Sequence, residues 1–199
     1  MPAKPRLILF ARYPVPGECK TRLIPAVGPA GAAAIHRKLA QHCAQLLCDS
    51  GCPVTIAYTG AGEDAFAEWL GERPDFAEQA SGDLTARLLP FCDDAPLIFF
   101  GSDTPDLGAS HIAAAIAGLE THEVVIGPAL DGGYYLIGIS KPLPQLFTDM
   151  PWSSDQVLPE TLRRLRAMEI EPLLLEPLSD CDTPADLEQW PELTERLSQ

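Results

Sequence analysis

The sequence lacks any long hydrophobic run. No apolar stretch among its 199 residues approaches the ~20 residues that a membrane-spanning helix needs, so we expect no membrane insertion. The N-terminal segment MPAKPRLILFARYP contains only a short apolar run and no small-residue cleavage site after it. This pattern argues against a secretory signal peptide, and we expect a cytoplasmic protein.

Paired cysteine motifs are also absent. The sequence has no CxxC pair, and its six cysteines are scattered: Cys19, Cys43, Cys48, Cys52, Cys92 and Cys181. A zinc site near His42 is an alternative, but the spacing of the three cysteines there matches no common structural-zinc pattern. Buried reduced thiols are the simpler interpretation for a cytoplasmic protein.

Several catalytic and nucleotide-binding signatures are missing. Neither the phosphate-binding pattern GxxxxGK[ST] nor the dinucleotide pattern GxGxxG occurs. No Ser-His-Asp or Cys-His arrangement stands out, and the four histidines lie in or beside predicted helices. The sequence therefore gives no sign of covalent catalysis by an activated serine or cysteine.

Basic residues are scarce and unevenly placed. The sequence has fourteen Lys and Arg residues but 28 Asp and Glu residues, which gives a net charge of −14. This charge argues against nucleic-acid binding. Residues 1–40, however, hold seven of the fourteen bases and a single acid, Glu18. A basic pocket on an acidic body suits a small anion such as a nucleotide.

Short apolar runs alternate with helical stretches along the chain. The predicted strands are residues 6–11, 53–60, 96–103, 123–129 and 134–139, because continuous apolar runs are typical of strands buried on both faces. The predicted helices are residues 29–47, 63–70, 84–92, 110–119, 153–168 and 183–190, the last beginning with Thr183 as cap and Pro184. This alternation predicts one α/β domain over residues 1–199, with a mostly parallel sheet covered on both faces.

The loop after the first predicted strand, ARYPVPGECKTRL, is stiff and basic. Gly17 would let a ligand approach the backbone, while Lys20, Thr21 and Arg22 supply two charges and a hydroxyl. Pro14 and Pro16 would limit the order that the loop must gain on binding. A solvated basic surface loop explains the same residues, and charge clustering alone does not separate the two interpretations.

Two later segments of the sequence contain candidate carboxylate ligands. FFGSDTPDLG places Asp103 at the end of a buried strand, with Asp106 close behind, and LSDCDTPADL places Asp180 and Asp182 before a predicted helix. Mg²⁺ typically takes one or two carboxylates and completes its shell with water and phosphate. Capping of a turn or helix is the simpler explanation for any one of these residues.

Two further segments combine turn residues with aromatics. Asp131, Gly132 and Gly133 separate two apolar runs, a strong hairpin signal, and Tyr134 follows directly. Hairpin geometry explains the glycines but not the tyrosines. Trp152, in PWSSDQVL, is either an aromatic platform for a sugar or base or a packing residue, and packing is the commoner role.

Taken in order, these segments resemble one bacterial family. FARYPVPGECKTRL, QASGDLTARL, FFGSDTPDL, GPALDGGYYLIG, PWSSDQVL and DCDTPADL are similar to the GT-A-like nucleotide-diphospho-sugar transferases of the rSAM/selenodomain-associated transferase 1 type. The resemblance runs from about Leu7 to Leu187. That family is related to the sugar-nucleotide and phospholactate nucleotidyltransferases, and the resemblance implies a Rossmann-like α/β/α sandwich that binds a nucleotide.

The resemblance also implies roles for particular residues. The loop that wraps the nucleotide phosphates, with Lys20 and Arg22 as catalytic cations, corresponds to Phe10, Ala11, Pro16, Gly17, Lys20, Thr21 and Arg22. Asp103 and Asp182 correspond to the carboxylates that hold Mg²⁺ or Mn²⁺, with Asp180 a near competitor for Asp182. Gly82 and Asp83 would lie near the base or ribose. The acceptor or sugar side would consist of Asp131, Gly132, Gly133, Tyr134 and Trp152. One departure is Thr85, where typical members carry glycine, and this residue could narrow the base side.

Three functions are compatible with these features. The first is metal-dependent transfer of a nucleotidyl group from a nucleoside triphosphate to a small phosphorylated acceptor, which needs charge stabilisation rather than a conspicuous nucleophile. The second is glycosyl transfer from a nucleotide sugar, with Asp131 as the candidate base. The third is a non-catalytic nucleotide sensor or interaction module of the same fold. We expect a nucleotide or nucleotide-sugar donor and a small-molecule acceptor as ligands.

Overall fold

A computed structural model describes residues 4–195 and contains one seven-stranded sheet. The strands are β1 (Arg6–Arg12), β2 (Val54–Thr59), β3 (Asp75–Glu78), β4 (Leu97–Phe100), β5 (Val124–Pro128), β6 (Tyr134–Ile139) and β7 (Leu173–Leu174), in the order β3-β2-β1-β4-β6-β5-β7. Only β6 runs antiparallel to its neighbours, β4 and β5. The mostly parallel sheet is confirmed. Strands β4 and β5 are buried along their whole length, and four of the seven residues of β1 are buried.

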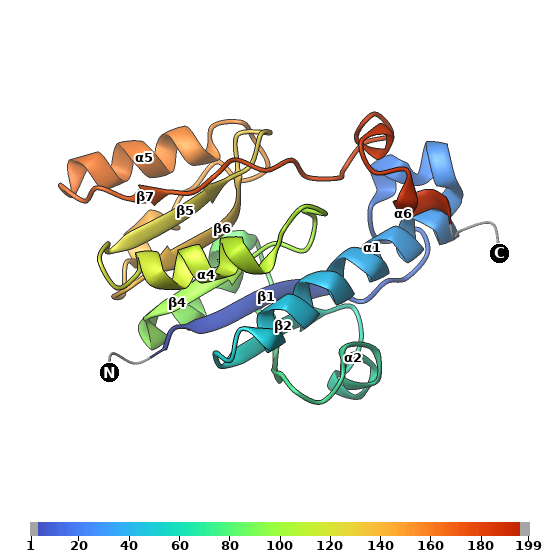
Figure 1. The fold of residues 1–199 in the computed structure, drawn as a ribbon, viewed down its shortest axis with the longest axis horizontal. Coiled ribbons are helices and arrows are strands. Elements are labelled where there is room, and N and C mark those ends of the chain that lie inside the picture. The colour runs from blue at the N-terminus through green and yellow to red at the C-terminus, as the bar shows by residue number, and fades with distance from the viewer. Residues whose placement is uncertain (1–3, 196–199) are drawn as a thin grey trace.

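Helices cover both faces of the sheet (Figure 1). The helices are α1 (Ile24–Asp49), α2 (Glu63–Leu70), α3 (Leu84–Leu88), α4 (Ala109–Gly118), α5 (Val157–Ala167) and α6 (Glu192–Glu195). Helices α1, α2 and α4 pack on one face, in a core that includes Leu9, Cys43 and Phe66. Helices α3 and α5 contribute Leu88 and Leu165 to the core on the other face. The predicted α/β/α sandwich is confirmed.

Some predicted boundaries were wrong. Helix α1 starts at Ile24 and is interrupted at Gly28, whose φ is 69°, before it continues from Pro29. The predicted helix over residues 84–92 ends at Leu88 and continues as a 3₁₀ helix (Leu89–Asp94) around Pro90. Helix α5 starts at Val157 rather than at residue 153. Strands β3 and β7 were not predicted, because a four-residue half-exposed strand and a two-residue strand carry too little periodicity.

The predicted last helix over residues 183–190 is only a 3₁₀ helix at Asp186–Glu188. Thr183 does not cap it. Instead the backbone N–H groups of Asp182 and Thr183 donate to the Asp186 carboxylate, at 2.9 and 2.6 Å. The segment after β7 crosses the molecule to α1 (Figure 1, red). It packs through Cys181, Leu187 and Trp190 in a cluster with Leu23, Ile35 and Leu39 of the N-terminal half.

The predicted hairpin joins β5 to β6. Gly132 adopts a φ of +93°, and a Cβ atom there would lie 2.6 Å from the backbone of Asp155. Both the turn and its close packing therefore require glycine. No helix in residues 4–195 is both long and apolar enough to span a bilayer.

Candidate nucleotide and metal site

Lys20, Asp103 and Asp182 meet beyond the carboxyl ends of β1 and β4. The Lys20 Nζ atom lies 2.8 Å from Oδ1 of Asp103 and 2.9 Å from Oδ1 of Asp182. It also donates to the Cys181 carbonyl at 2.8 Å. An ammonium group has three N–H donors, so all three are engaged. The Lys20 side chain is 3% exposed, whereas the two carboxylates are 45% and 48% exposed.

The backbone brings these residues together from three distant segments. Lys20 ends the basic loop in a left-handed conformation, with a φ of 46°, which is uncommon for a residue with a side chain. The Asp103 carbonyl accepts from the Cys181 N–H at 2.9 Å, so the DCD segment runs directly beside the end of β4. Arg22 lies on the open side of the cluster, 73% exposed, with Nη1 3.6 Å from Oδ2 of Asp182.

The charges of the cluster perturb its titration. Burial by itself would lower the pKa of Lys20, but the carboxylates of Asp103 and Asp182 outweigh burial and raise that pKa. Lys20 is therefore a cation in the folded protein. Beside it, burial is the main cause that raises the pKa of Asp180 to about 6, with the charges of Asp103 and Asp131 acting in the same direction. The hydroxyl of Thr104 donates to Asp180 Oδ1 at 2.6 Å.

The donor set of this cluster fits a divalent cation. Asp103 and Asp182 each turn Oδ1 toward Lys20, and both side chains remain about half exposed. Within residues 4–195 no three His, Cys, Asp or Glu side chains are arranged to hold an ion together. Two carboxylates, with water and substrate phosphate, are nevertheless a usual ligand set for Mg²⁺. The Lys20 ammonium between the carboxylates and the Arg22 guanidinium beside Asp182 both oppose a further cation.

A small apolar pocket lies toward the carboxyl ends of β1 and β4. Its volume is about 150 Å³, and it is lined by Phe10 of β1, Leu84 of α3, Gly101 after β4 and Tyr134 of β6, among others. Gly101 precedes Asp103 by two residues in the loop after β4. The structure thus brings Phe10, predicted on the nucleotide side, and Tyr134, predicted on the acceptor side, to one pocket. Burial raises the pKa of the Tyr134 hydroxyl above its ordinary value.

The remaining loop residues lie at the same edge of the sheet. Ala11 is buried in β1, while Pro16, Gly17 and Thr21 are exposed. Gly17 has a φ of +88°, and no atom lies within 4 Å of the position that a Cβ would take. The space beside this glycine is accordingly open.

Gly82 and Asp83 form the start of α3. Gly82 has a φ of +118°, and the Asp83 carboxylate accepts from the Ala86 N–H at 3.0 Å as a helix cap. Thr85 contacts Trp152 directly: the indole Nε1–H donates to the Thr85 hydroxyl at 2.8 Å, and that hydroxyl donates to the Phe147 carbonyl at 2.7 Å. Trp152 is therefore anchored and partly packed in the core rather than a fully open platform.

The hairpin residues have structural partners. Asp131 Oδ1 accepts from the Gly133 N–H at 2.9 Å, the bond that shapes the turn. Asp106, considered above as a cation ligand, accepts from the Trp190 indole at 3.0 Å and so ties the C-terminal segment to the loop after β4.

Of the six cysteines, all unpaired, Cys19, Cys43, Cys92 and Cys181 are buried and two are half-buried.

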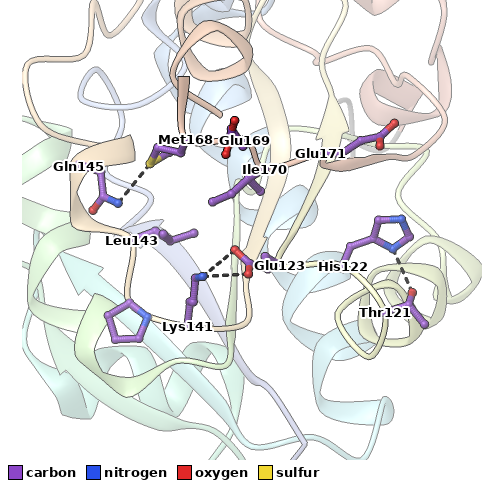
Figure 2. A pocket seen from close by; sticks show the side chains of 11 residues that line it. Thr121, His122, Glu123, Lys141, Leu143, Gln145, Met168, Glu169, Ile170 and Glu171 are labelled. Atoms are coloured by element: carbon purple, nitrogen blue, oxygen red, sulfur yellow. Dashed lines mark hydrogen bonds and ion pairs between the residues drawn. The ribbon is translucent and has the colours of Figure 1, made fainter. Parts of the chain in front are cut away.

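A wider cavity, of about 920 Å³, lies at the opposite end of the strands, where β5 starts and β6 ends. Figure 2 shows that its Lys141 is bridged by Glu123, at 2.8 Å, while Glu169 and Glu171 are further acids on its wall. Because its cation is already paired and its other charged groups are acidic, this cavity does not suit a phosphate ligand. The polar cluster at the carboxyl edge is the better candidate for chemistry, since ligands of such sheets bind there.

Comparisons with known proteins identify the family and the fold of this chain. A family model described as "Uncharacterized protein conserved in bacteria (DUF2064)" matches residues 41–154. The chain belongs to this family. A crystal structure from Desulfovibrio desulfuricans G20, provisionally described as a nucleotide-diphospho-sugar transferase, is 31% identical to this DUF2064 chain. Its TM-score is 0.89, and the match covers 98% of this chain and 89% of that one. Among curated proteins, none matches the sequence.

More distant structures share the fold of this DUF2064 chain. CMP:2-keto-3-deoxy-manno-octonic acid synthetase, solved with CTP, is 16% identical with a TM-score of 0.57, covering 96% of this chain and 98% of that one. Rv0371c from Mycobacterium tuberculosis H37Rv, solved with manganese, is 15% identical with a TM-score of 0.57, covering 98% and 100%. The DUF2064 chain therefore has the nucleotide-diphospho-sugar transferase fold.

Sequence reasoning missed two arrangements at this edge. The Thr104–Asp180 contact joins residues 76 positions apart, and no local signal predicts it. Arg87 was quoted within QASGDLTARL but given no role, although it is the basic residue of that segment. In this DUF2064 structure it contacts Gln79 and Gly82. Its position shortly after Gly82, a glycine in a turn segment, is the sequence signal that could have identified Arg87.

Proposed function

We propose that this chain is a metal-dependent transferase that uses a nucleotide or nucleotide-sugar donor, and that nucleotidyl transfer to a small acceptor is its reaction. The observation that carries the proposal is the convergence of Lys20, Asp103 and Asp182 at the carboxyl edge of the sheet. The related structure at 31% identity and the CTP and manganese complexes of fold relatives support a nucleotide and a divalent cation as ligands.

In this proposal each residue of the cluster has a distinct task. Asp103 and Asp182 would hold Mg²⁺ or Mn²⁺ through their exposed oxygens. A bound cation would supply positive charge against the phosphate oxygens. Lys20 forms ion pairs with both carboxylates in the free protein. We propose that it releases them on cation binding and turns its ammonium toward the phosphates. Arg22, already on the open side, would stabilise the departing group.

Nucleotidyl transfer balances without a protein nucleophile. An acceptor oxygen forms a bond to the α-phosphorus, the bond from that phosphorus to the β-bridging oxygen breaks, and pyrophosphate leaves. In glycosyl transfer the bond from the sugar's anomeric carbon to the diphosphate oxygen breaks instead, and a nucleoside diphosphate leaves. Exposed Arg22 beside the carboxylates suits the higher charge of a triphosphate, which is why we favour nucleotidyl transfer.

A thermal-shift screen with product analysis tests the proposed function. Nucleoside triphosphates and nucleotide sugars are added with and without Mg²⁺ or Mn²⁺, and a ligand at 100 times its Kd should stabilise the protein by about 2.7 kcal/mol. We expect Asp103→Asn and Asp182→Asn to abolish the metal-dependent part of the shift. Asp93→Asn, an exposed acid remote from the cluster, is the control. Absence of any nucleotide-induced shift would contradict the proposal, and release of a nucleoside diphosphate instead of pyrophosphate would select glycosyl transfer.

A further inference from the structure

Arg87 is a half-buried cation of α3 at the carboxyl edge of the sheet. Its Nε–H donates to the Gly82 carbonyl at 3.2 Å, and Nη1 donates to Gln79 Oε1 at 3.4 Å. Most basic side chains in residues 4–195 have a carboxylate partner, but none lies within ion-pair distance of Arg87. Its charge is therefore uncompensated, in a protein whose net charge is −14.

Gln79 fixes the position of this guanidinium. The Gln79 amide Nε2 donates to the carbonyls of Ala57, at 2.7 Å, and Ala11, at 3.3 Å. The Gln79 backbone N–H also donates to the Tyr58 carbonyl at 2.9 Å. These two bonds, to β1 and β2, orient the side-chain amide of Gln79. Its Oε1 atom then accepts from Arg87. Arg87 is thereby tied, through one side chain, to the end of the strand from which the basic loop departs.

The remaining donors of Arg87 suit an anion. A guanidinium has five N–H donors in a planar fork, and the two contacts above use two of them. Three donors, including both on Nη2, have no partner among the described residues. Partial burial of a charge without a counter-ion is unfavourable, so the arrangement makes sense where an anionic ligand supplies the missing charge. A phosphate is the group that such a fork binds best.

We propose that Arg87 is a further donor-binding residue, which binds a phosphate of the nucleotide, and that Gln79 is its positioning residue. This inference rests on the proposed function, because it takes the nucleotide to lie along the carboxyl edge between α3 and the basic loop. It adds a cation from the QASGDLTARL segment to the two of the loop, Lys20 and Arg22.

The test compares ligands with and without phosphate. The triphosphate that gives the largest thermal shift, its nucleoside and inorganic pyrophosphate are titrated calorimetrically into wild type, Arg87→Gln and Arg87→Lys. We expect Arg87→Gln to weaken triphosphate and pyrophosphate binding by about tenfold or more, since a charged hydrogen bond is lost, and to leave nucleoside binding unchanged. Arg87→Lys keeps the charge but not the fork, so we expect an intermediate loss.

Arg166→Gln, an exposed arginine of α5 that lacks an ion pair among the described residues, is the matched control and should bind like wild type. Thermal unfolding of each variant confirms that it is folded. Normal triphosphate binding by Arg87→Gln, together with a loss in Arg22→Gln, would overturn the inference and leave the proposed function intact. An equal loss for nucleoside and triphosphate would also overturn it, because the contact would then be to the base or ribose. No binding by wild type would overturn both.

Discussion

At the scale of single residues, Lys20 decides how the candidate site behaves without ligand. One buried ammonium satisfies two carboxylates and a carbonyl, and a divalent cation needs the same two carboxylates. Charges of the same sign a few ångströms apart repel strongly in a partly buried site. The free protein should therefore bind a metal ion weakly, and the phosphates of a nucleotide should strengthen that binding by drawing Lys20 away.

Replacing Lys20 with methionine tests this competition. We expect Lys20→Met to bind Mn²⁺, in the absence of nucleotide, at least about tenfold more tightly than wild type, because removal of a competing cation is worth about 1.4 kcal/mol or more. Electron paramagnetic resonance of free Mn²⁺ measures the affinity. Lys141→Met, which removes a lysine paired with Glu123 at the opposite end of the strands, should leave it unchanged. Weaker Mn²⁺ binding by Lys20→Met would show that the ammonium holds the carboxylates in place instead.

Asp180 makes stability depend on pH. Its pKa is about 6 in the folded protein, against an ordinary value of 3.8, so the folded state holds the proton more tightly than the unfolded state does. Stability is consequently lost as pH rises from about 4 to about 6, and the loss persists above that range. A shift of roughly two units corresponds to about 3 kcal/mol as an upper figure, since Asp180 is not fully buried.

We therefore expect Asp180→Asn to be more stable than wild type at pH 7.5 and to differ little near pH 3.5. The asparagine can still accept from Thr104 but cannot ionise. Urea unfolding across this pH range measures the difference, and Asp93→Asn, an exposed acid, is the control that should follow wild type. A constant difference between Asp180→Asn and wild type at every pH would contradict the shifted ionisation.

At the scale of elements, loops are held by contacts that their own residues do not reveal. The Arg164 guanidinium of α5 donates to the carbonyls of Gln145, Leu146, Thr148 and Asp149. The Leu158 N–H at the start of the same helix donates to the Gly132 carbonyl at 2.9 Å. Helix α5 thus fixes the segment that carries Trp152 and also the β5–β6 hairpin, the two parts predicted to form the acceptor side.

The hairpin glycines make a matched pair for a test. Gly132→Ala places a side chain at a φ of +93° and within 2.6 Å of the Asp155 backbone, so we expect a loss of at least about 2 kcal/mol in the free energy of unfolding. Gly133→Ala meets only Asp131 Oδ1, at 3.2 Å, without a positive φ, and should cost less than about 1 kcal/mol. Urea denaturation compares them. Equal losses would indicate that the hairpin is not packed on residue 155.

At the scale of the whole molecule, the C-terminal segment joins the two halves of the chain. It pairs beside β5 through β7, supplies Asp180 and Asp182 to the cluster, and ends against α1 through Trp190 and Leu193 (Figure 1). The position of Asp182 therefore depends on Trp190, which lies further along the chain. Trp190 packs against α1, and its indole N–H donates to the Asp106 carboxylate.

Trp190→Ala tests this dependence. Loss of a buried tryptophan should cost about 3–5 kcal/mol of stability, and we expect nucleotide and Mn²⁺ binding to weaken as well, because the DCD segment is no longer held on α1. Leu165→Ala removes a fully buried side chain from the core on the other face and should cost about 2–5 kcal/mol without weakening binding. Both variants are titrated at a temperature where they remain folded. Equal binding by the two would contradict the coupling.

The sequence by itself determined the sheet and the set of chemical groups. Continuous apolar runs identified β1, β2, β4, β5 and β6, because a strand buried on both faces has to be apolar along its length. Turn chemistry predicted the hairpin, and the order of motifs predicted the family and the fold. Weak elements, such as β7 and the 3₁₀ helix near Asp186, were missed or misassigned because only neighbouring segments stabilise them.

Only the tertiary structure decided how the groups are paired. Lys20 meets Asp182 across 162 positions, and Trp152 meets Thr85 across 67, distances in sequence at which no local pattern carries information. The same folding left Arg87 without a carboxylate and engaged all three donors of Lys20. The hydrogen-bond and ion-pair partners of a side chain are set by the residues close to it in space. The sequence could therefore identify candidate phosphate-binding cations, but it could not show which of them lacks a carboxylate partner.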